Sequence, residues 1–173
     1  MRRIGQQAGM TAAGLYRHCR DKEDLFGQLV SGPAEDLKAW MTRHAADTMC
    51  AAAEGGAGLW NNTWIDMMRE LVYPRMEEYR LLLCRSQGTV YENYLRDLTD
   101  LAQKSMLEAL ELLKSQGRPV KEITTKELHL LLSGYTAAVF EPVINQYSRE
   151  DAERCLATVE AFFLPGWQKL MGF

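Results

Sequence analysis

A chain of 173 residues, 47% hydrophobic and 25% charged, is long enough to bury a core, and this composition excludes a disordered or fibrous protein. The net charge of −3 conceals an asymmetry: residues 1–20 contain four arginines and no acidic residue, whereas residues 31–173 contain 15 Lys and Arg against 20 Asp and Glu. A basic N-terminal segment on an acidic body favours a tip that binds polyanions, although four arginines also fit a solvated surface.

The cysteine spacing and the hydropathy exclude several further classes of protein. Cys19, Cys50, Cys84 and Cys155 show no CxxC spacing, which argues against a disulfide framework or a zinc site. The richest apolar stretch, 128–140, is interrupted by polar residues and is shorter than the roughly 18 residues that a membrane span needs. No apolar stretch follows the initial Met-Arg-Arg, so no signal peptide is indicated. We therefore expect a cytoplasmic protein that has no metal or cofactor and does not contact a membrane.

The pattern of apolar residues predicts an all-α fold. Leu, Ala, Glu, Met and Arg recur at spacings of three and four residues, and no alternating run of β-branched residues occurs. The expected helices cover 2–8, 11–19, 21–49 with an interruption, 59–72, 74–86, 90–115, 125–146 and 149–164.

Caps and breakers mark the ends of these helices. Thr11 and Asp21 are good N-cap residues for the second and third helices. Gly32-Pro33 should kink or break the third helix, because proline lacks a backbone donor and clashes with the preceding turn. The segment 51–58, AAAEGGAG, is typical of a flexible connection.

The N-terminal residues 4–19 predict two short helices that meet at a tight turn. Gly5 is small enough to let the helices cross closely, and Gly9 can take the positive φ that the turn requires. Met10 and Leu15 are expected to point into the angle between the helices. The second helix begins with the small residues Thr-Ala-Ala-Gly, so its tip is slim enough to enter a major groove.

Three segments of this region resemble the signature of the TetR family of repressors: Gly9-Met10-Thr11, Leu15-Tyr16-Arg17-His18 and Lys22-Glu23-Asp24-Leu25-Phe26. The family pattern is Gly, an apolar residue and Ser or Thr, then Leu-Tyr-x-His-Phe, then Lys-Glu-x-Leu. The specific match covers residues 4–30, and the rest of the chain is similar only in helix count and length. The resemblance implies DNA contacts from seven residues: Thr11, Tyr16, His18 and Lys22 to phosphate, and Ala12, Ala13 and Arg17 to bases.

The sequence departs from the family pattern at three places. Cys19 stands where the family usually has Phe, and Gly14 replaces a residue that is often Thr, which lowers helix propensity by about 1 kcal/mol. The family also places a further helix before the position of Arg2. We therefore expect the natural start to lie upstream, and the alternative is a protein that has lost tight DNA binding.

The last two predicted helices are apolar on more than one face, which favours burial against two partners. The second partner is most simply the same helix pair of another copy, which gives a four-helix interface between two subunits. The alternative is a wider core within one chain. The residues assigned to the interface are Leu128, Leu132, Tyr135, Val139, Cys155, Leu156, Val159, Phe162 and Phe163.

Aromatic and thioether groups concentrate in the middle helices, and such groups often line ligand pockets. We therefore expect an effector cavity there, with ordinary core packing as the alternative. The residues assigned to the cavity are Trp60, Trp64, Met67, Met68, Tyr91, Tyr94 and Tyr135.

These inferences combine into one hypothesis. Residues 1–30 form a helix-turn-helix module for DNA, and residues 31–173 form a domain for ligand binding and dimerisation. The chain would be a transcriptional regulator, most simply a repressor, that binds a palindromic operator as a homodimer and is released by a small apolar or aromatic effector. The alternative is a ligand-binding or interaction protein of TetR descent that no longer binds DNA. No catalytic motif such as HExxH, GxSxG or a P-loop is present, so no enzymatic activity is expected.

Overall fold

Residues 1–54 and 64–172 are described by the computed structural model, and every regular element within these ranges is helical. The predicted all-α fold is therefore confirmed for this part of the chain. The elements are α1 (Arg2–Gln7), α2 (Ala12–Leu15), α3 (Lys22–Ala53), α4 (Trp64–Met67), the π-helix η1 (Met68–Val72), the 3₁₀ turn η2 (Tyr73–Arg75), α5 (Met76–Cys84), α6 (Tyr94–Ser115), α7 (Thr125–Ile144) and α8 (Arg149–Met171).

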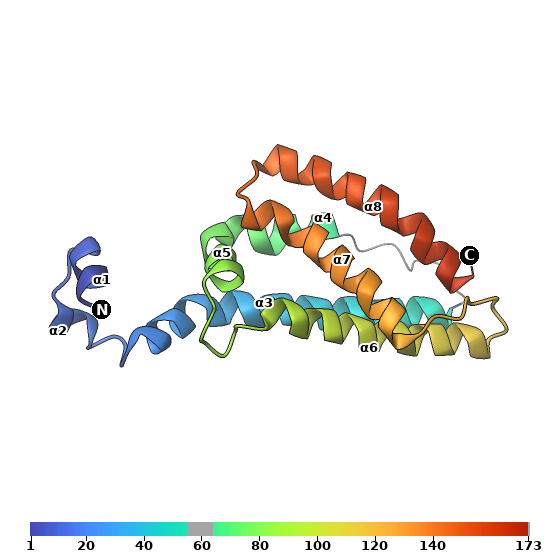
Figure 1. Ribbon diagram of the computed structural model, residues 1–173, viewed down its shortest axis with the longest axis horizontal. Helices are drawn as coiled ribbons and strands as arrows, with labels where there is room; N and C mark the ends of the chain where they lie inside the picture. Colours follow the sequence, from blue (N-terminus) through green and yellow to red (C-terminus); the bar gives the residue numbers. More distant parts are fainter. Residues whose placement is uncertain (55–63, 173) are drawn as a thin grey trace.

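The helices form a layered body with a small projecting end (Figure 1). α3 and α6 lie side by side, and α7 packs across α6 and α5. α8 runs along the outer side of α7 and also contacts α4. α1 and α2 contact each other and lie beyond the start of α3, away from the other helices (Figure 1). α3 therefore connects the projecting end to the body.

One side of α3 carries the apolar residues that fix it to the body. Val30, Ala34, Leu37 and Met41 recur at spacings of three and four residues, and each is at most 5% exposed. Residues at these spacings share one face of a helix, so burial of this face sets the orientation of the whole element. Full burial of a Val, Leu or Met side chain contributes about 1.5–3 kcal/mol.

The sequence predicts a kink or a break at Gly32-Pro33, and the structure shows no break, because α3 continues through Pro33. Proline removes one backbone hydrogen bond from a helix. Pro33 and Leu37 are nevertheless buried on the inner face, and we infer that this burial outweighs the local cost. Arg75 of η2 braces the same region, since its Nη1 donates to Asp36 Oδ2 at 2.8 Å.

α3 also ends later than expected. The helix runs to Ala53, so the first part of the predicted connection over 51–58 is helical. Ala51 and Ala52 are buried, which explains why the helix extends into this segment. The rest of that connection, from residue 55 onward, lies outside the described residues.

α8 likewise extends past a proline. It continues through Pro165 to Met171, whereas the sequence predicts an end near residue 164. Trp167, Leu170 and Met171 are each at most 8% exposed, so this last part of α8 buries a large apolar area. As in α3, tertiary burial outweighs the local preference of proline.

A π-helix, η1, replaces part of the ordinary helix predicted over 59–72. A π-helix has a wider turn than an α-helix and is often found near functional sites. Met67, Met68 and Val72 are all fully buried, although the first two are neighbours in the chain. These three side chains therefore pack into the core, while Arg69 and Glu70 of η1 remain exposed.

The core consists of two apolar clusters. The first joins the first half of α3 to α4, η1, α5 and the C-terminal half of α7, and includes Tyr79 and Phe140. The second joins the end of α3 to the ends of α6 and α8 and the start of α7, and includes Leu113 and Trp167. The body is thus packed in two centres along the length of α3.

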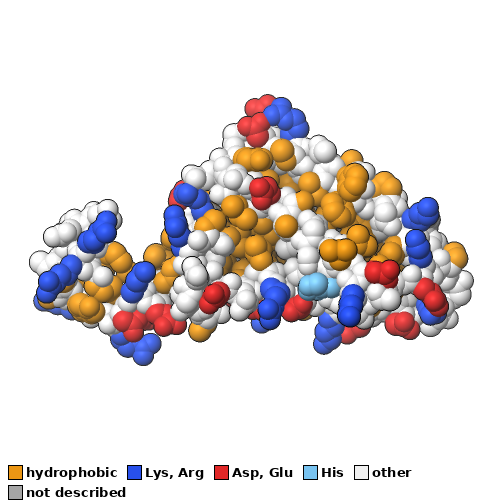
Figure 2. Space-filling view, viewed as in Figure 1, with side chains coloured by type: hydrophobic (Ala, Val, Ile, Leu, Met, Phe, Trp, Pro, Cys, Tyr) orange, Lys and Arg blue, Asp and Glu red, His pale blue; other side chains and the backbone are white. Residues whose placement is uncertain are grey.

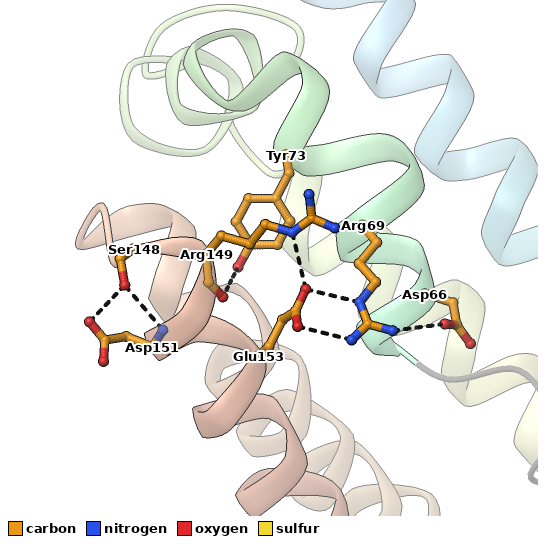
Figure 3. A network of polar contacts seen from close by, with 7 residues as sticks. All are labelled: Asp66, Arg69, Tyr73, Ser148, Arg149, Asp151 and Glu153. Carbon is orange, nitrogen blue, oxygen red and sulfur yellow. Dashed lines mark hydrogen bonds and ion pairs between the residues drawn. The ribbon is translucent and has the colours of Figure 1, made fainter.

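A polar network fastens the start of α8 to η1 (Figure 3). Arg69 donates from Nε and Nη2 to the two carboxylate oxygens of Glu153, both at 2.9 Å. Arg149 Nε donates to the same carboxylate at 3.1 Å. The hydrogen bonds from Arg69 and Arg149 lower the pKa of Glu153 to about 2. These hydrogen bonds link the start of α8 directly to η1.

The packing predicts that Leu156 is a core residue of the single chain. Leu156→Ala should lower the free energy of unfolding by about 2–5 kcal/mol, because Leu156 is fully buried in the first cluster. Urea denaturation followed by circular dichroism measures the change. The exposed Thr158→Ala on the same helix is the control and should stay within about 0.5 kcal/mol of the wild type. Equal effects of the two substitutions would contradict the core position of Leu156.

Candidate nucleic-acid interface and ligand cavity

The turn between α1 and α2 depends on two glycines, as the sequence predicts. Gly9 has a φ of +66°, a left-handed conformation that glycine adopts without strain. The Met10 N–H donates to the Gly5 carbonyl at 2.8 Å. A Cβ at Gly5 would lie 2.9 Å from the Met10 carbonyl oxygen, so this close approach requires glycine.

α2 is a single turn of helix. The Gly14 N–H donates to Thr11 Oγ1 at 3.0 Å, which confirms the predicted cap. The helix ends at Leu15 instead of continuing to Cys19, and a tighter turn follows in which the His18 N–H donates to the Leu15 carbonyl at 3.0 Å. Gly14 weakens the helix by about 1 kcal/mol relative to Ala, which favours this early end. Leu15 and Cys19 are buried and anchor the turn from beneath.

The residues expected to contact DNA lie at the surface. The exposed ones are Thr11, Ala13, Tyr16, Arg17, His18 and Lys22, while Ala12 is half-buried. Tyr16 is 54% exposed. Met10, which the sequence places between the helices, is instead 37% exposed, because its backbone rather than its side chain faces Gly5.

The projecting end is basic. Four arginines, all of them exposed, lie within its first twenty residues: Arg2, Arg3, Arg17 and Arg20. Figure 2 shows Lys and Arg side chains on this end of the molecule. No acidic residue occurs before Asp21, so the exposed surface of α1 and α2 carries only positive charge. Such a surface attracts the phosphates of a nucleic acid.

The acidic residues that begin α3 are used in capping. Asp21 accepts a hydrogen bond from the Asp24 N–H at 2.8 Å, as the sequence predicts for an N-cap. Asp24 in turn accepts from the Arg20 N–H at 2.7 Å, and this bond lowers the pKa of the Asp24 carboxyl group. These two carboxylates therefore serve the helix start and hold the chain where α2 joins α3.

Two side chains of α3 contact the turn after α2 and the body, respectively. Gln28 Nε2 donates to the His18 carbonyl at 3.0 Å and ties the turn after α2 to α3. Phe26 of α3 packs against Tyr91, with ring centroids 6.3 Å apart. The orientation of the basic tip therefore follows the orientation of α3.

A cavity of about 160 Å³ lies in the body, where the two apolar clusters meet. α3, α4, α6, α7 and α8 all contribute to its wall. Met41 and Trp64 of the first cluster line it, as do Leu132 and Trp167 of the second. The volume is below the roughly 300–1,000 Å³ typical of sites for drug-sized molecules, so the cavity fits a small ligand.

Aromatic rings form much of the wall. Trp64 and Tyr135 meet edge to face with centroids 5.7 Å apart, and Tyr135 and Trp167 do so at 6.1 Å. His44 stacks on Trp40 at 4.9 Å and also lines the cavity. Rings in such contacts have fixed orientations, so the wall offers flat apolar faces.

Two side chains in the wall have buried polar atoms that lack a hydrogen-bond partner among the described residues, His44 Nδ1 and Glu160 Oε1. Burial lowers the pKa of His44 and raises the pKa of Glu160, because a desolvated site disfavours the charged form of each. By contrast, the hydroxyls of Thr48 and Ser105 donate to carbonyls of their own helices. His44 and Glu160 are therefore the groups with unused hydrogen-bonding capacity.

The residues assigned to the cavity from sequence divide into three groups. Trp64 and Tyr135 line it. Met67 and Met68 are fully buried in the first cluster, while Tyr91 and Tyr94 are half-buried against that cluster, and none of the four lines the cavity. Trp60 lies outside the described residues.

Sequence reasoning did not identify His44 and Glu160 as cavity residues. Glu160 follows Leu156 by four residues, so an acidic group occupies the buried side of an apolar helix. His44 follows Trp40 by the same spacing on α3. An ionisable residue at a core-facing position of a helix is the signal that could have indicated a ligand site.

The residues assigned to a subunit interface are mostly inside the single chain. Those at most 4% exposed are Leu128, Leu132, Val139 and Leu156, and those half-buried are Tyr135, Cys155, Val159 and Phe163. Phe162 alone among the assigned residues is exposed, at 78%. The outer faces of α7 and α8 therefore consist of other residues, including Leu130, which is 72% exposed.

The described residues contain no cluster of three or more His, Cys, Asp or Glu that could hold a metal ion. Within the same part of the chain, none of the helices combines the length and hydropathy needed to cross a bilayer. Comparison with protein-family models and with solved structures finds no match to this chain. Functional inference therefore depends on the residues themselves and on their arrangement.

The burial of His44 predicts how its ring titrates. The pKa of His44 should lie below 6.5 in the folded protein, because desolvation outweighs the attraction of Asp47. As the pH falls below 6.5, His44 takes up a proton more readily in the unfolded chain than in the folded one. The free energy of unfolding therefore decreases in acid because of this residue. Titration of the histidine ring signals by NMR, assigned with His44→Phe, measures the midpoint. A midpoint at or above 6.5 would contradict the buried, neutral state.

Proposed function

We propose that this chain is a ligand-responsive transcriptional regulator that binds double-stranded DNA as a homodimer. The observation that carries the proposal is the projecting end, residues 1–20, whose exposed surface is basic and free of acidic residues and includes Thr11, Tyr16 and Arg17 of the TetR-like motif. The slim residues at the start of α2, including Ala13, suit entry into a major groove, and Tyr16 and Lys22 suit phosphate contacts at its edges.

A dimer would place two copies of the tip at a set distance from each other. Two recognition helices about 34 Å apart, one helical turn of DNA, read the halves of a palindromic site. The outer faces of α7 and α8 support such a dimer, because Leu130 and Phe162 are exposed there and apolar side chains gather over these helices (Figure 2). Small exposed residues on the same two helices, Gly134 of α7 and Ala161 of α8, would allow a second copy to approach closely.

The cavity would supply the response to a ligand. α3 contributes His44 and Met41 to the cavity wall and begins at the basic tip, so one helix connects the two sites. A ligand that binds one orientation of α3 more tightly would shift the population of dimers toward that orientation. The expected consequence is a change in the separation of the two tips and release from the operator.

A second candidate is a ligand-binding protein of the same descent that does not bind DNA. The shortness of α2, which has four residues, favours this alternative because a single helical turn presents few groups to a groove. The cavity would serve either function, so a DNA-binding measurement separates them.

Binding to DNA that flanks the protein's own gene tests the interface. Lys22→Ala should weaken binding and reduce the slope of log affinity against log salt concentration by about 1, because one phosphate contact is lost. Arg17→Ala should cost about 1–3 kcal/mol if the side chain reads a base. Fluorescence anisotropy across a salt series measures both effects. Arg96→Ala, an exposed arginine on α6, is the control, and equal loss in all three variants would refute the assigned contacts.

Charge placed on the outer faces of α7 and α8 tests the dimer. Phe162→Glu and Leu130→Glu should each convert the dimer to a monomer, because a carboxylate buried without a partner at an interface is costly. Sedimentation velocity measures the mass of each variant. Lys104→Glu on α6 is the matched control and should remain dimeric. A wild-type chain that sediments as a monomer at all concentrations would exclude the dimer.

A further inference from the structure

Glu160 is the one acidic residue among the described residues that line the cavity. It lies on α8 beside Tyr135, whose pKa is raised by burial and by the nearby charge of Glu160. The Glu160 carboxylate accepts hydrogen bonds from the backbone N–H groups of Trp64 and Ile65 at the start of α4. Its Oε1 atom is buried and has no partner among the described residues. The carboxylate is therefore only partly hydrogen-bonded by the described residues, and Oε1 is left available to a ligand.

No positively charged side chain among the described residues pairs with Glu160. No Lys or Arg of the described residues lines the cavity, and no ion pair within that part of the chain includes Glu160. The neighbouring charge that acts on it is Asp66, which is also negative. A carboxylate in an apolar site without a counter-ion is unfavourable, so a cation placed beside it would be strongly stabilised.

The rings around the carboxylate favour the same kind of ligand. Trp64, Tyr135 and Trp167 line the cavity, and the faces of such rings attract a cation. A flat aromatic group of the ligand would also pack against them. His44 supplies a further unpartnered atom, Nδ1, and because burial lowers its pKa, the ring stays neutral and does not repel a cation.

We infer that the cavity binds a small aromatic amine, with its ammonium group paired with Glu160 and its ring held among Trp64, Tyr135 and Trp167. The cavity volume of about 160 Å³ suits one ring system with a short amino arm. This inference rests on the proposed function, because it names the chemical class of the effector for that regulator.

Three ligands of similar shape and different charge test the inference. Phenethylamine is a cation at neutral pH, phenethyl alcohol is neutral, and phenylacetate is an anion. Isothermal titration calorimetry with the full chain should give an affinity for the amine at least about ten-fold above that for the alcohol, with the anion weakest. Equal binding of amine and alcohol, preference for the anion, or no binding of any of the three would overturn the inference.

Variants of α8 assign the preference to Glu160. Glu160→Gln keeps the size of the side chain and removes the charge, so it should bind the amine and the alcohol equally. Glu150→Gln, an exposed residue on the same helix, should keep the wild-type preference. Circular dichroism verifies folding, and if Glu160→Gln is unfolded, Glu160→Asp replaces it and should keep the order amine, alcohol, anion. A preference retained in Glu160→Gln, or lost in Glu160→Asp, would overturn the assignment.

DNA binding measured in parallel separates the two proposals. Amine binding in a chain that does not bind DNA would refute the regulator and leave the ligand class intact. DNA binding in a chain that ignores the amine would refute the ligand class alone.

Discussion

The burial of one face of α3 is the constraint on which the rest of the structure depends. Val30, Leu37 and Met41 fix the helix to the first cluster, and Ala52 near its end joins the second. Because one uninterrupted helix passes from the basic tip through both clusters, α5, α6 and η1 pack against it. A division of the chain at residue 30 falls within this helix, so one continuous helix begins next to the tip and runs through the body.

The cavity follows from the way in which the two clusters meet. Protein interiors are normally packed without sizeable voids, and buried polar atoms are normally paired. Here the rings of Trp64, Tyr135 and Trp167, which meet edge to face, border a cavity, and His44 and Glu160 each have a buried polar atom without a partner among the described residues. A void and unpaired polar groups at the same place are what a ligand site provides before its ligand binds.

Local features were predictable from the sequence, and features set by distant contacts were not. The caps at Thr11 and Asp21 and the turn at Gly9 depend on neighbouring residues alone, and all three are confirmed. The break allowed at Gly32-Pro33 does not occur, and the helix end expected near residue 164 was wrong, because burial against distant helices outweighs a local rule. Helical spacing marks Met67, Met68 and Trp64 alike as inward-facing, but it does not indicate which of them borders a void.

The length of α3 has a mechanical consequence. A helix rises about 1.5 Å per residue, so the stretch from His44 back to Lys22 is an arm of about 33 Å. A tilt of about 3° at the inner end of this arm would carry the outer end through about 2 Å. In the proposed symmetric dimer, the distance between the two DNA-facing ends would change by up to about twice that amount. Such a change would spoil the fit of the two tips to successive grooves of DNA, which lie about 34 Å apart. In the proposed dimer, a rearrangement the size of one side chain would then be enough to move the two tips out of register with the DNA grooves.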